Sequence, residues 1–136
     1  MKRLVVLFLL ISSTFILAQE ANKVNLSNPN ATIYTHLFFL QKDSYNLEKA
    51  AKTIIPNSTD DAAKAAVKLK QILDGKGLLV DFKVIPKNTN YKDSLNYTVA
   101  VNKYVLFPER MPLISVEKLG DKWYYSLETI QNLDEN

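Results

Sequence analysis

The chain has 136 residues, with 17 basic and 14 acidic side chains and no cysteine. The absence of cysteine excludes thiol catalysis, zinc–cysteine sites and redox motifs. Basic and acidic residues are interspersed, so the net charge of +3 is not the footprint of a nucleic-acid-binding face. The composition therefore indicates one small domain with an ordinary globular surface.

The N-terminal segment has the layout of a secretory signal peptide. A positive start, Met1-Lys2-Arg3, precedes the apolar run Leu4–Leu17, which is interrupted only by hydroxyl residues. This run of about 14 residues is shorter than the ~20 that span a bilayer. We expect residues 1–18 to be a signal peptide cleaved after Ala18, and residues 19–136 to be one exported, periplasmic domain without a membrane span. The alternative is an uncleaved N-terminal anchor.

Two helices are predicted after the signal peptide. Asn28 is a suitable N-cap and Pro29 suits the first helical position, so a helix begins there. Its apolar residues recur at helical spacing, namely Ile33, Leu37 and Leu40. A second, short helix is predicted from Leu47 to about Thr53, ended by Pro56.

A third helix is predicted within "STDDAAKAAVKLKQILDGKG". We expect Ser58 to be its N-cap, because Asp60 and Asp61 then fall in the first turn, where the helix dipole favours negative charge. Gly75 is the expected left-handed residue at its end. The apolar face is formed by Ala62, Ala66, Leu69 and Leu73, with Ala63 and Val67 beside them. Its small residues favour close packing on the first helix.

The pattern changes to period two from Gly77. Val80, Phe82 and Val84 alternate with polar residues, which predicts a half-buried strand or extended segment before a polar, Asn-rich loop. Residues 103–107 form the next expected strand. A hairpin follows, with its turn at Gly120-Asp121, and Ser126 caps a last short helix. The expected fold is α+β: two to three N-terminal helices packed on a small antiparallel C-terminal sheet, with a terminal hairpin and short helix.

Few residues offer catalytic chemistry. His36 is the one histidine, and no carboxylate lies near it in the sequence, so a structural or solvent-facing role is favoured over a catalytic one. Asp60 and Asp61 are explained by their place at a helix start rather than by cation binding or acid–base work. The three glycines fit turns and caps, not a phosphate loop. We expect no enzyme activity, no cofactor and no metal site.

Four motifs in register carry a family resemblance: "IYTHLFFLQ", "LKQILDGKGLLVDF" followed by "VIP", "YVLFPERMP" and "VEKLGDKWYYSLETI". From about Asn28 to Ile130 the chain resembles the N-terminal extracytoplasmic domain of Bacteroidetes-type members of the small-conductance mechanosensitive channel (MscS) family. The resemblance implies a module that precedes membrane helices in oligomeric, solute-releasing channels. This sequence ends at Asn136, where the family continues toward its first membrane helix, so we expect an accessory role and no pore.

Aromatic residues supply the candidate interaction site. In a hairpin, Trp123 and Tyr125 share one face and Tyr124 lies on the other. We expect the first two to cover the helical core, with Tyr124 either an ordinary surface residue or part of a contact patch with Tyr91 or Tyr97.

Three functions follow from this reading of the sequence. The first is an interaction module whose partner is a mechanosensitive channel, another cell-envelope protein or a second copy. The second is a periplasmic or secreted domain that binds a small ligand, which an enclosed apolar pocket would favour. The third is a small hydrolase, which requires polar side chains converging on His36.

Overall fold

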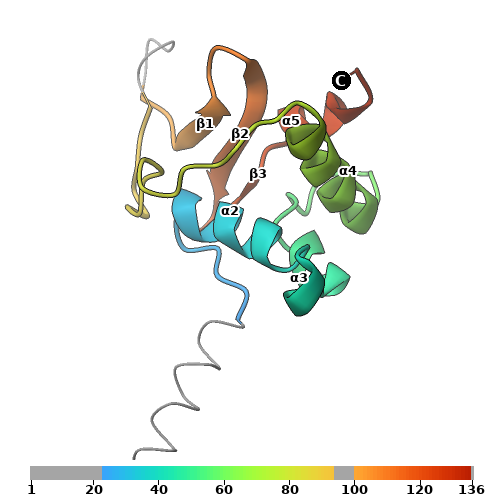
Figure 1. Cartoon of the computed structure of the whole chain (residues 1–136). Coiled ribbons are helices and arrows are strands. Elements are labelled where there is room, and N and C mark those ends of the chain that lie inside the picture. The colour runs from blue at the N-terminus through green and yellow to red at the C-terminus, as the bar shows by residue number, and fades with distance from the viewer. Residues whose placement is uncertain (1–22, 94–99, 136) are drawn as a thin grey trace, which may run out of the picture.

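Three helices precede the strands and one follows them in the computed structural model, which describes residues 23–93 and 100–135. Figure 1 shows α2 crossing in front of the strands, with α3 and α4 to one side. The α+β prediction is confirmed: helices precede a three-stranded antiparallel sheet and a short helix. The helices are α2 (Pro29–Phe38), α3 (Leu47–Ala51), α4 (Ala62–Gly75) and α5 (Leu127–Gln131); the strands are β1 (Lys103–Phe107), β2 (Met111–Leu119) and β3 (Lys122–Tyr125); the 3-10 turns are Lys42–Ser44 and Leu133–Glu135.

The strands follow the order β1-β2-β3, and both neighbouring pairs are antiparallel. The β2–β3 hairpin closes at the pair Leu119 and Lys122, so Gly120 and Asp121 form a two-residue turn, as predicted. Gly120 has a φ of 65°, a conformation that favours glycine at the first central position of a type II′ turn. This turn fixes which hairpin residues face the core.

The outer edge of β3 is covered by the chain itself. The backbone N–H of Trp123 donates to the Leu26 carbonyl at 2.7 Å, and that of Tyr125 donates to Thr53 at 2.8 Å. The N–H of Ile55 completes the pairing by donating to the Tyr125 carbonyl at 3.2 Å. Segments before α2 and after α3 thus occupy an edge that would otherwise be open to another strand.

The core lies between the helices and one face of the sheet. Trp123, Tyr125 and Val116 are fully buried on the strands, as predicted for the first two. They meet fully or almost fully buried side chains of the helices, chiefly Ile33, Leu69 and Leu73. Helix α4 packs on α3, which also packs on α2, so the predicted close packing of α4 on the first helix is wrong. A direct link from α2 to α4 is the bond from His36 to the Ala66 carbonyl.

Helix bounds differ from the prediction at three places. The N-cap of α4 is Asp61, whose carboxylate accepts from the N–H of Ala63 and Lys64; Ser58 instead accepts from Asp60 within the preceding turn. Gly75 is the last residue of α4, and Gly77 has the positive φ of 64°. The second helix ends at Ala51, two residues earlier than expected, and the Thr53 hydroxyl donates to the Ala50 carbonyl.

The strand or extended segment predicted around residues 80–84 is wrong, because the chain forms a turn at residues 82–84. The Asp81 carboxylate accepts from the Lys83 N–H, and the Val84 N–H donates to the Asp81 carbonyl, so the chain turns here. The side-chain amide of Asn30 also donates to the carbonyls of Phe82 and Ile85, which fixes this segment on α2 instead of on a neighbouring strand. As a result Val84 lies in solvent, with 68% of its surface exposed.

Candidate functional site

The tyrosines predicted as a contact patch lie apart. Tyr124 is half-buried and pairs with Glu117, on the sheet face that points away from the core. Tyr91 packs edge-on against Tyr104 at 5.8 Å between ring centroids. Tyr104 pairs with Val116, which faces the core, and directly paired residues share a face. Tyr91 and Tyr124 therefore lie on opposite faces of the sheet, and Tyr97 lies outside the described residues.

Tyr91 has a distinct electrostatic environment. Partial desolvation raises the pKa of its hydroxyl, and the carboxylate of Asp93 raises it further. The Asn102 amide donates to its carbonyl at 2.8 Å, so the loop is fixed beside β1. The Asn102 bond and the ring contact keep Tyr91 packed on Tyr104.

His36 is wholly buried in α2, which excludes the solvent-facing alternative. Its Nε2 lies 2.8 Å from the Ala66 carbonyl oxygen, which can only accept, so Nε2 carries the proton. Nδ1 then accepts from the Tyr125 hydroxyl at 2.9 Å. Burial lowers the pKa of His36, and the hydrogen bond to the Ala66 carbonyl raises it. Burial is the larger effect, and the resulting pKa is about 4. Both ring nitrogens are occupied by structural partners.

The carboxylates at the start of α4 have a similar structural explanation. Asp61 is the N-cap, and Asp60 lies beside it in an open hollow that Lys64 and Lys68 also line. Nearby lysines make this hollow mixed in charge rather than acidic. Among residues 23–93 and 100–135, no group of three or more histidine, aspartate or glutamate side chains could hold a metal ion.

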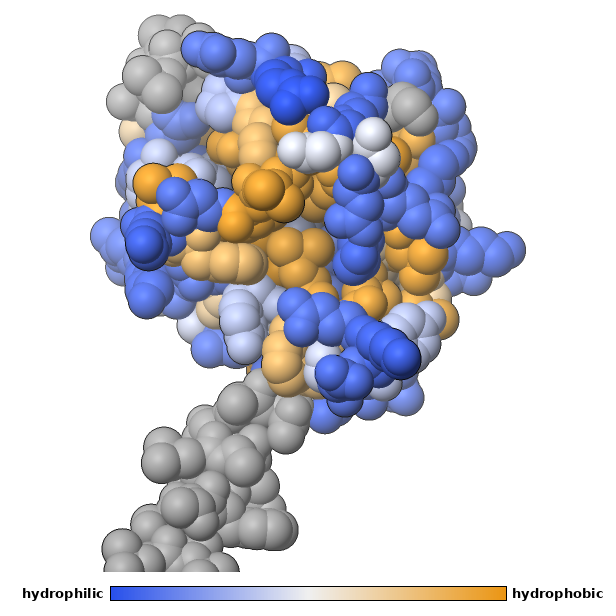
Figure 2. All heavy atoms as spheres, in the orientation of Figure 1, coloured by the Kyte–Doolittle hydropathy of each residue, from blue (hydrophilic) through white to orange (hydrophobic). Residues whose placement is uncertain are grey.

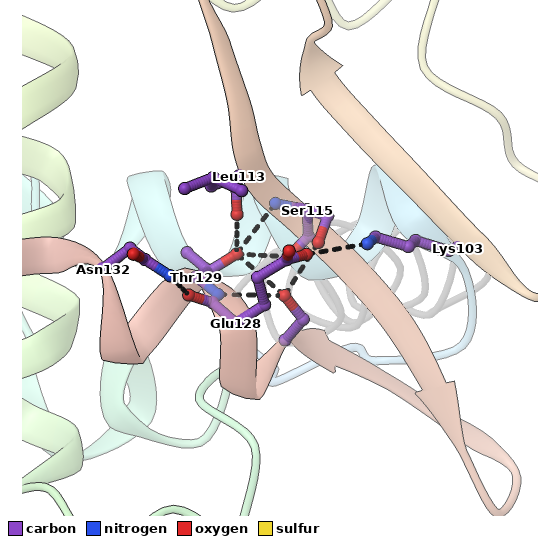
Figure 3. A network of polar contacts seen from close by, with 7 residues as sticks. Lys103, Leu113, Ser115, Glu128, Thr129 and Asn132 are labelled. Carbon is purple, nitrogen blue, oxygen red and sulfur yellow. Dashed lines mark hydrogen bonds and ion pairs between the residues drawn. The ribbon is translucent and has the colours of Figure 1, made fainter. Parts of the chain in front are cut away.

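A hydroxyl network, not predicted from the sequence, fixes α5 on β2 (Figure 3). The Ser115 and Ser126 hydroxyl oxygens lie 2.7 Å apart, and Ser126 lies 2.9 Å from the Thr129 hydroxyl. Thr129 donates to the Leu113 carbonyl and accepts from the Ser115 N–H. Each hydroxyl can thus donate to the next, ending at a carbonyl. The three hydroxyl residues are almost fully buried, so they stabilise the α5–β2 contact and meet no substrate.

An ion pair closes the outer side of the same contact. Lys103 Nζ lies 2.8 Å from Glu128 Oε2, which links β1 to α5 (Figure 3). The side-chain amide of Asn132 donates to the Glu128 carbonyl at 2.8 Å. The sequence indicated one residue of this site, the capping residue Ser126. The residues on β1 and β2 that complete the site are distant in the sequence, so local spacing cannot identify them.

Exposed apolar residues gather over the segment between α4 and β1. Leu79 is 89% exposed, Val84 is 68% exposed, and the half-buried Phe82 lies between them in the sequence. The Phe82 ring packs edge-on against Tyr34 of α2 at 5.7 Å. We call Tyr34, Leu79, Phe82 and Val84 the apolar loop surface. Figure 2 shows hydrophobic side chains in the middle of this face, where Figure 1 shows the segment crossing in front of the sheet.

Of this surface, Phe82 and Val84 were predicted to alternate in a strand or extended segment. Within residues 23–93 and 100–135, no helix is both long enough and apolar enough to cross a bilayer. No protein-family model, no curated protein and no solved structure matches the chain.

Proposed function

We propose that the chain is a non-enzymatic extracytoplasmic interaction module, related to the N-terminal domain of mechanosensitive channels and forming no pore itself. The observation that carries this proposal is the apolar loop surface. Leu79 and Val84 are strongly exposed although their segment is held firmly, since Asn30 binds two of its carbonyl groups. Exposed apolar side chains on a fixed backbone are typical of a contact site.

The surroundings of His36 and of the buried hydroxyl groups support a non-enzymatic role. A general base needs a nitrogen or oxygen that can reach a substrate proton. Both nitrogens of His36 are engaged, by Ala66 and Tyr125, in a site closed to solvent. The Ser115–Ser126–Thr129 hydroxyls pass their hydrogen bonds to backbone carbonyls and include no base.

A small-ligand-binding role would be favoured by an enclosed apolar pocket between helices and sheet. Trp123 and Tyr125 fill this space from the sheet, and Leu69 and Leu73 fill it from α4. The hollow at the start of α2 is open and lined by polar residues such as Asn25 and Asn28. No observation at these positions favours a ligand, so the interaction module is the better-supported proposal.

Binding is tested by recovery of partners from detergent-solubilised membranes of the native cell. The bait is the exported chain, as wild type, as Leu79→Asp and as Leu119→Asp. Leu119 is 44% exposed and lies on the sheet face of Tyr124, so it is a matched control. We expect a channel polypeptide to be recovered by wild type and Leu119→Asp, and lost with Leu79→Asp. Equal recovery by all three baits, or by none, contradicts the proposal.

The same cells test export. Mass spectrometry of the chain in the periplasmic fraction should give a polypeptide that begins at Gln19. A charged residue placed in the apolar run 4–17 should leave the chain in the cytoplasm, because the signal requires an uninterrupted apolar core. Wild-type chain found only in the cytoplasm would contradict an extracytoplasmic role.

A further inference from the structure

We propose that the apolar loop surface binds an anionic lipid bilayer, with Leu79 and Val84 inserted among the headgroups. This inference rests on the proposed function, because it adds a bilayer contact at the same surface of the interaction module. The two side chains are the most exposed large apolar groups in the described chain, at 89% and 68%. Their exposure leaves them free to enter another phase without any rearrangement of the core.

The backbone that carries these residues is fixed at both ends. Leu78 and Ile85 are buried in the core, and the Leu78 N–H donates to the Leu73 carbonyl at 2.9 Å. The Asn30 amide holds the Phe82 and Ile85 carbonyls at 2.8 and 3.2 Å. A segment fixed in this way loses little conformational freedom when it binds.

Charges around the loop complement an anionic surface. Lys76, Lys83 and Lys87 are exposed along the segment, and within residues 23–93 and 100–135 they form no ion pair. Arg110 lies beside Lys76, since its guanidinium donates to the Lys76 carbonyl at 3.2 Å. Asp81, the one acidic residue between Lys76 and Lys87, is engaged as an acceptor in the turn. Basic residues around an inserted apolar group are the pattern that binds anionic lipid headgroups.

The apolar loop surface is smaller than a complete protein interface, so it suits a bilayer contact beside the membrane partner of the proposed function. A specific protein interface covers about 800 Å² on each partner, with a central apolar cluster. The apolar loop surface offers two fully projecting side chains, and its other members, Tyr34 and Phe82, are partly covered by each other. Shallow insertion into headgroups needs only a few apolar side chains when lysines add electrostatic attraction.

Co-sedimentation with phospholipid vesicles tests this proposal on the exported chain. The vesicles are phosphatidylcholine alone, and phosphatidylcholine mixed with phosphatidylglycerol. We expect binding to the mixed vesicles, weakened more than about tenfold by Leu79→Asp with Val84→Asp. Each of Lys83→Gln and Lys87→Gln should weaken it about fivefold, and added salt should weaken it further. Leu119→Asp, on the other sheet face, should bind as wild type does.

A spectroscopic readout locates the contact. The chain has no cysteine, so Val84→Cys accepts a single environment-sensitive fluorophore. Its emission should shift to the blue with mixed vesicles, while a fluorophore at Leu119→Cys should not respond. Equal responses at both positions, or equal binding to neutral vesicles, would overturn the proposal.

The proposed function and this inference can fail separately. If the chain does not bind vesicles but recovers a membrane protein in a Leu79-dependent manner, the proposed lipid contact is wrong and the proposed interaction module is supported. Concentration-dependent self-association abolished by Leu79→Asp, without vesicle binding, would assign the surface to a second copy and also overturn the lipid contact. If the substitutions change neither experiment, both proposals are wrong.

Discussion

Nδ1 of His36 lies 2.9 Å from the hydroxyl oxygen of Tyr125, and this contact joins α2 to β3 inside the core. The rings also meet edge-on, with centroids 4.9 Å apart. Because Nε2 donates to Ala66 of α4, one imidazole links three elements. In the neutral ring the proton is on Nε2, so protonation of Nδ1 reverses the bond to Tyr125 and places a positive charge in the core.

Stability should therefore fall with acid in a defined window. The pKa of His36 is about 4 in the folded protein, against 6.5 for a histidine exposed to water. The unfolded chain thus binds more protons between these values, so stability is full above pH 6.5 and is lost as the pH falls toward 4. The total loss from this group is about 3 kcal/mol. Urea unfolding between pH 7 and pH 4 measures it.

His36→Asn is the control for this pH dependence. Carboxylates also titrate near pH 4, so the informative quantity is the difference between wild type and variant across the window. The variant should be less stable at pH 7 and should lose less stability on acidification. Parallel pH profiles for the two proteins would contradict the assignment to His36.

Removal of the Tyr125 hydroxyl tests the same contact from the other side. Tyr125→Phe keeps the packed ring but leaves the buried Nδ1 of His36 without a donor, which should cost about 1–3 kcal/mol of unfolding free energy. Tyr124→Phe is the matched control, because Tyr124 is half-buried on the other sheet face. Its cost should stay within about 0.5 kcal/mol. Equal costs for the two variants in urea unfolding would show that the buried bond contributes nothing.

Local signals were sufficient where the cap and its partners are neighbours in the sequence. Asn28 caps α2 through the Ala31 N–H, and Ser126 caps α5 through the Thr129 N–H, as predicted for both residues. The hairpin turn at Gly120 was predictable for the same reason, because its geometry depends on two adjacent residues. The residues that determine these caps and this turn lie within four positions of one another in the sequence.

The remaining features depend on contacts between residues that are far apart in the sequence. The alternation from Val80 to Val84 fits a strand, but Asn30, 52 residues from Phe82, takes the carbonyl that a neighbouring strand would have used. Tyr91 and Tyr124 were combined in one patch because sequence reasoning cannot tell which face a loop covers. The contact of Tyr91 with the Tyr104 ring and the register of the strands determine which face Tyr91 covers. The apolar loop surface was missed for the same reason.

The start of α4 gives a direct test of two competing caps. Asp61 accepts from the N–H groups of Ala63 and Lys64 at 2.9 and 3.2 Å, whereas Ser58 accepts only from Asp60. Asp61→Ala should therefore destabilise the protein by about 1 kcal/mol. Ser58→Ala should cost less than about 0.5 kcal/mol. Urea unfolding of the two variants compares the costs, and the reverse order would restore the cap predicted from the sequence.

The hydroxyl network under α5 should be among the polar contacts most sensitive to substitution. Thr129→Val keeps the shape of the side chain but removes the acceptor for the Ser115 N–H and for the Ser126 hydroxyl. Two buried donors left unpaired should cost about 3 kcal/mol, within the range for such groups. Thr59→Val is the control, because Thr59 is exposed. Thermal unfolding should show a clear fall in Tm for Thr129→Val and almost none for Thr59→Val.

A second readout separates loss of the network from general damage. Because Thr129 fixes α5 on β2 through the Leu113 carbonyl and the Ser115 N–H, its loss should free this end of the chain first. Amide exchange should therefore rise at Ser115 and in α5 before it rises at Trp123, whose N–H is held by Leu26 on the far edge of the sheet. An equal rise in exchange at Ser115, in α5 and at Trp123 would mean that the network stabilises the whole domain and does not specifically anchor α5.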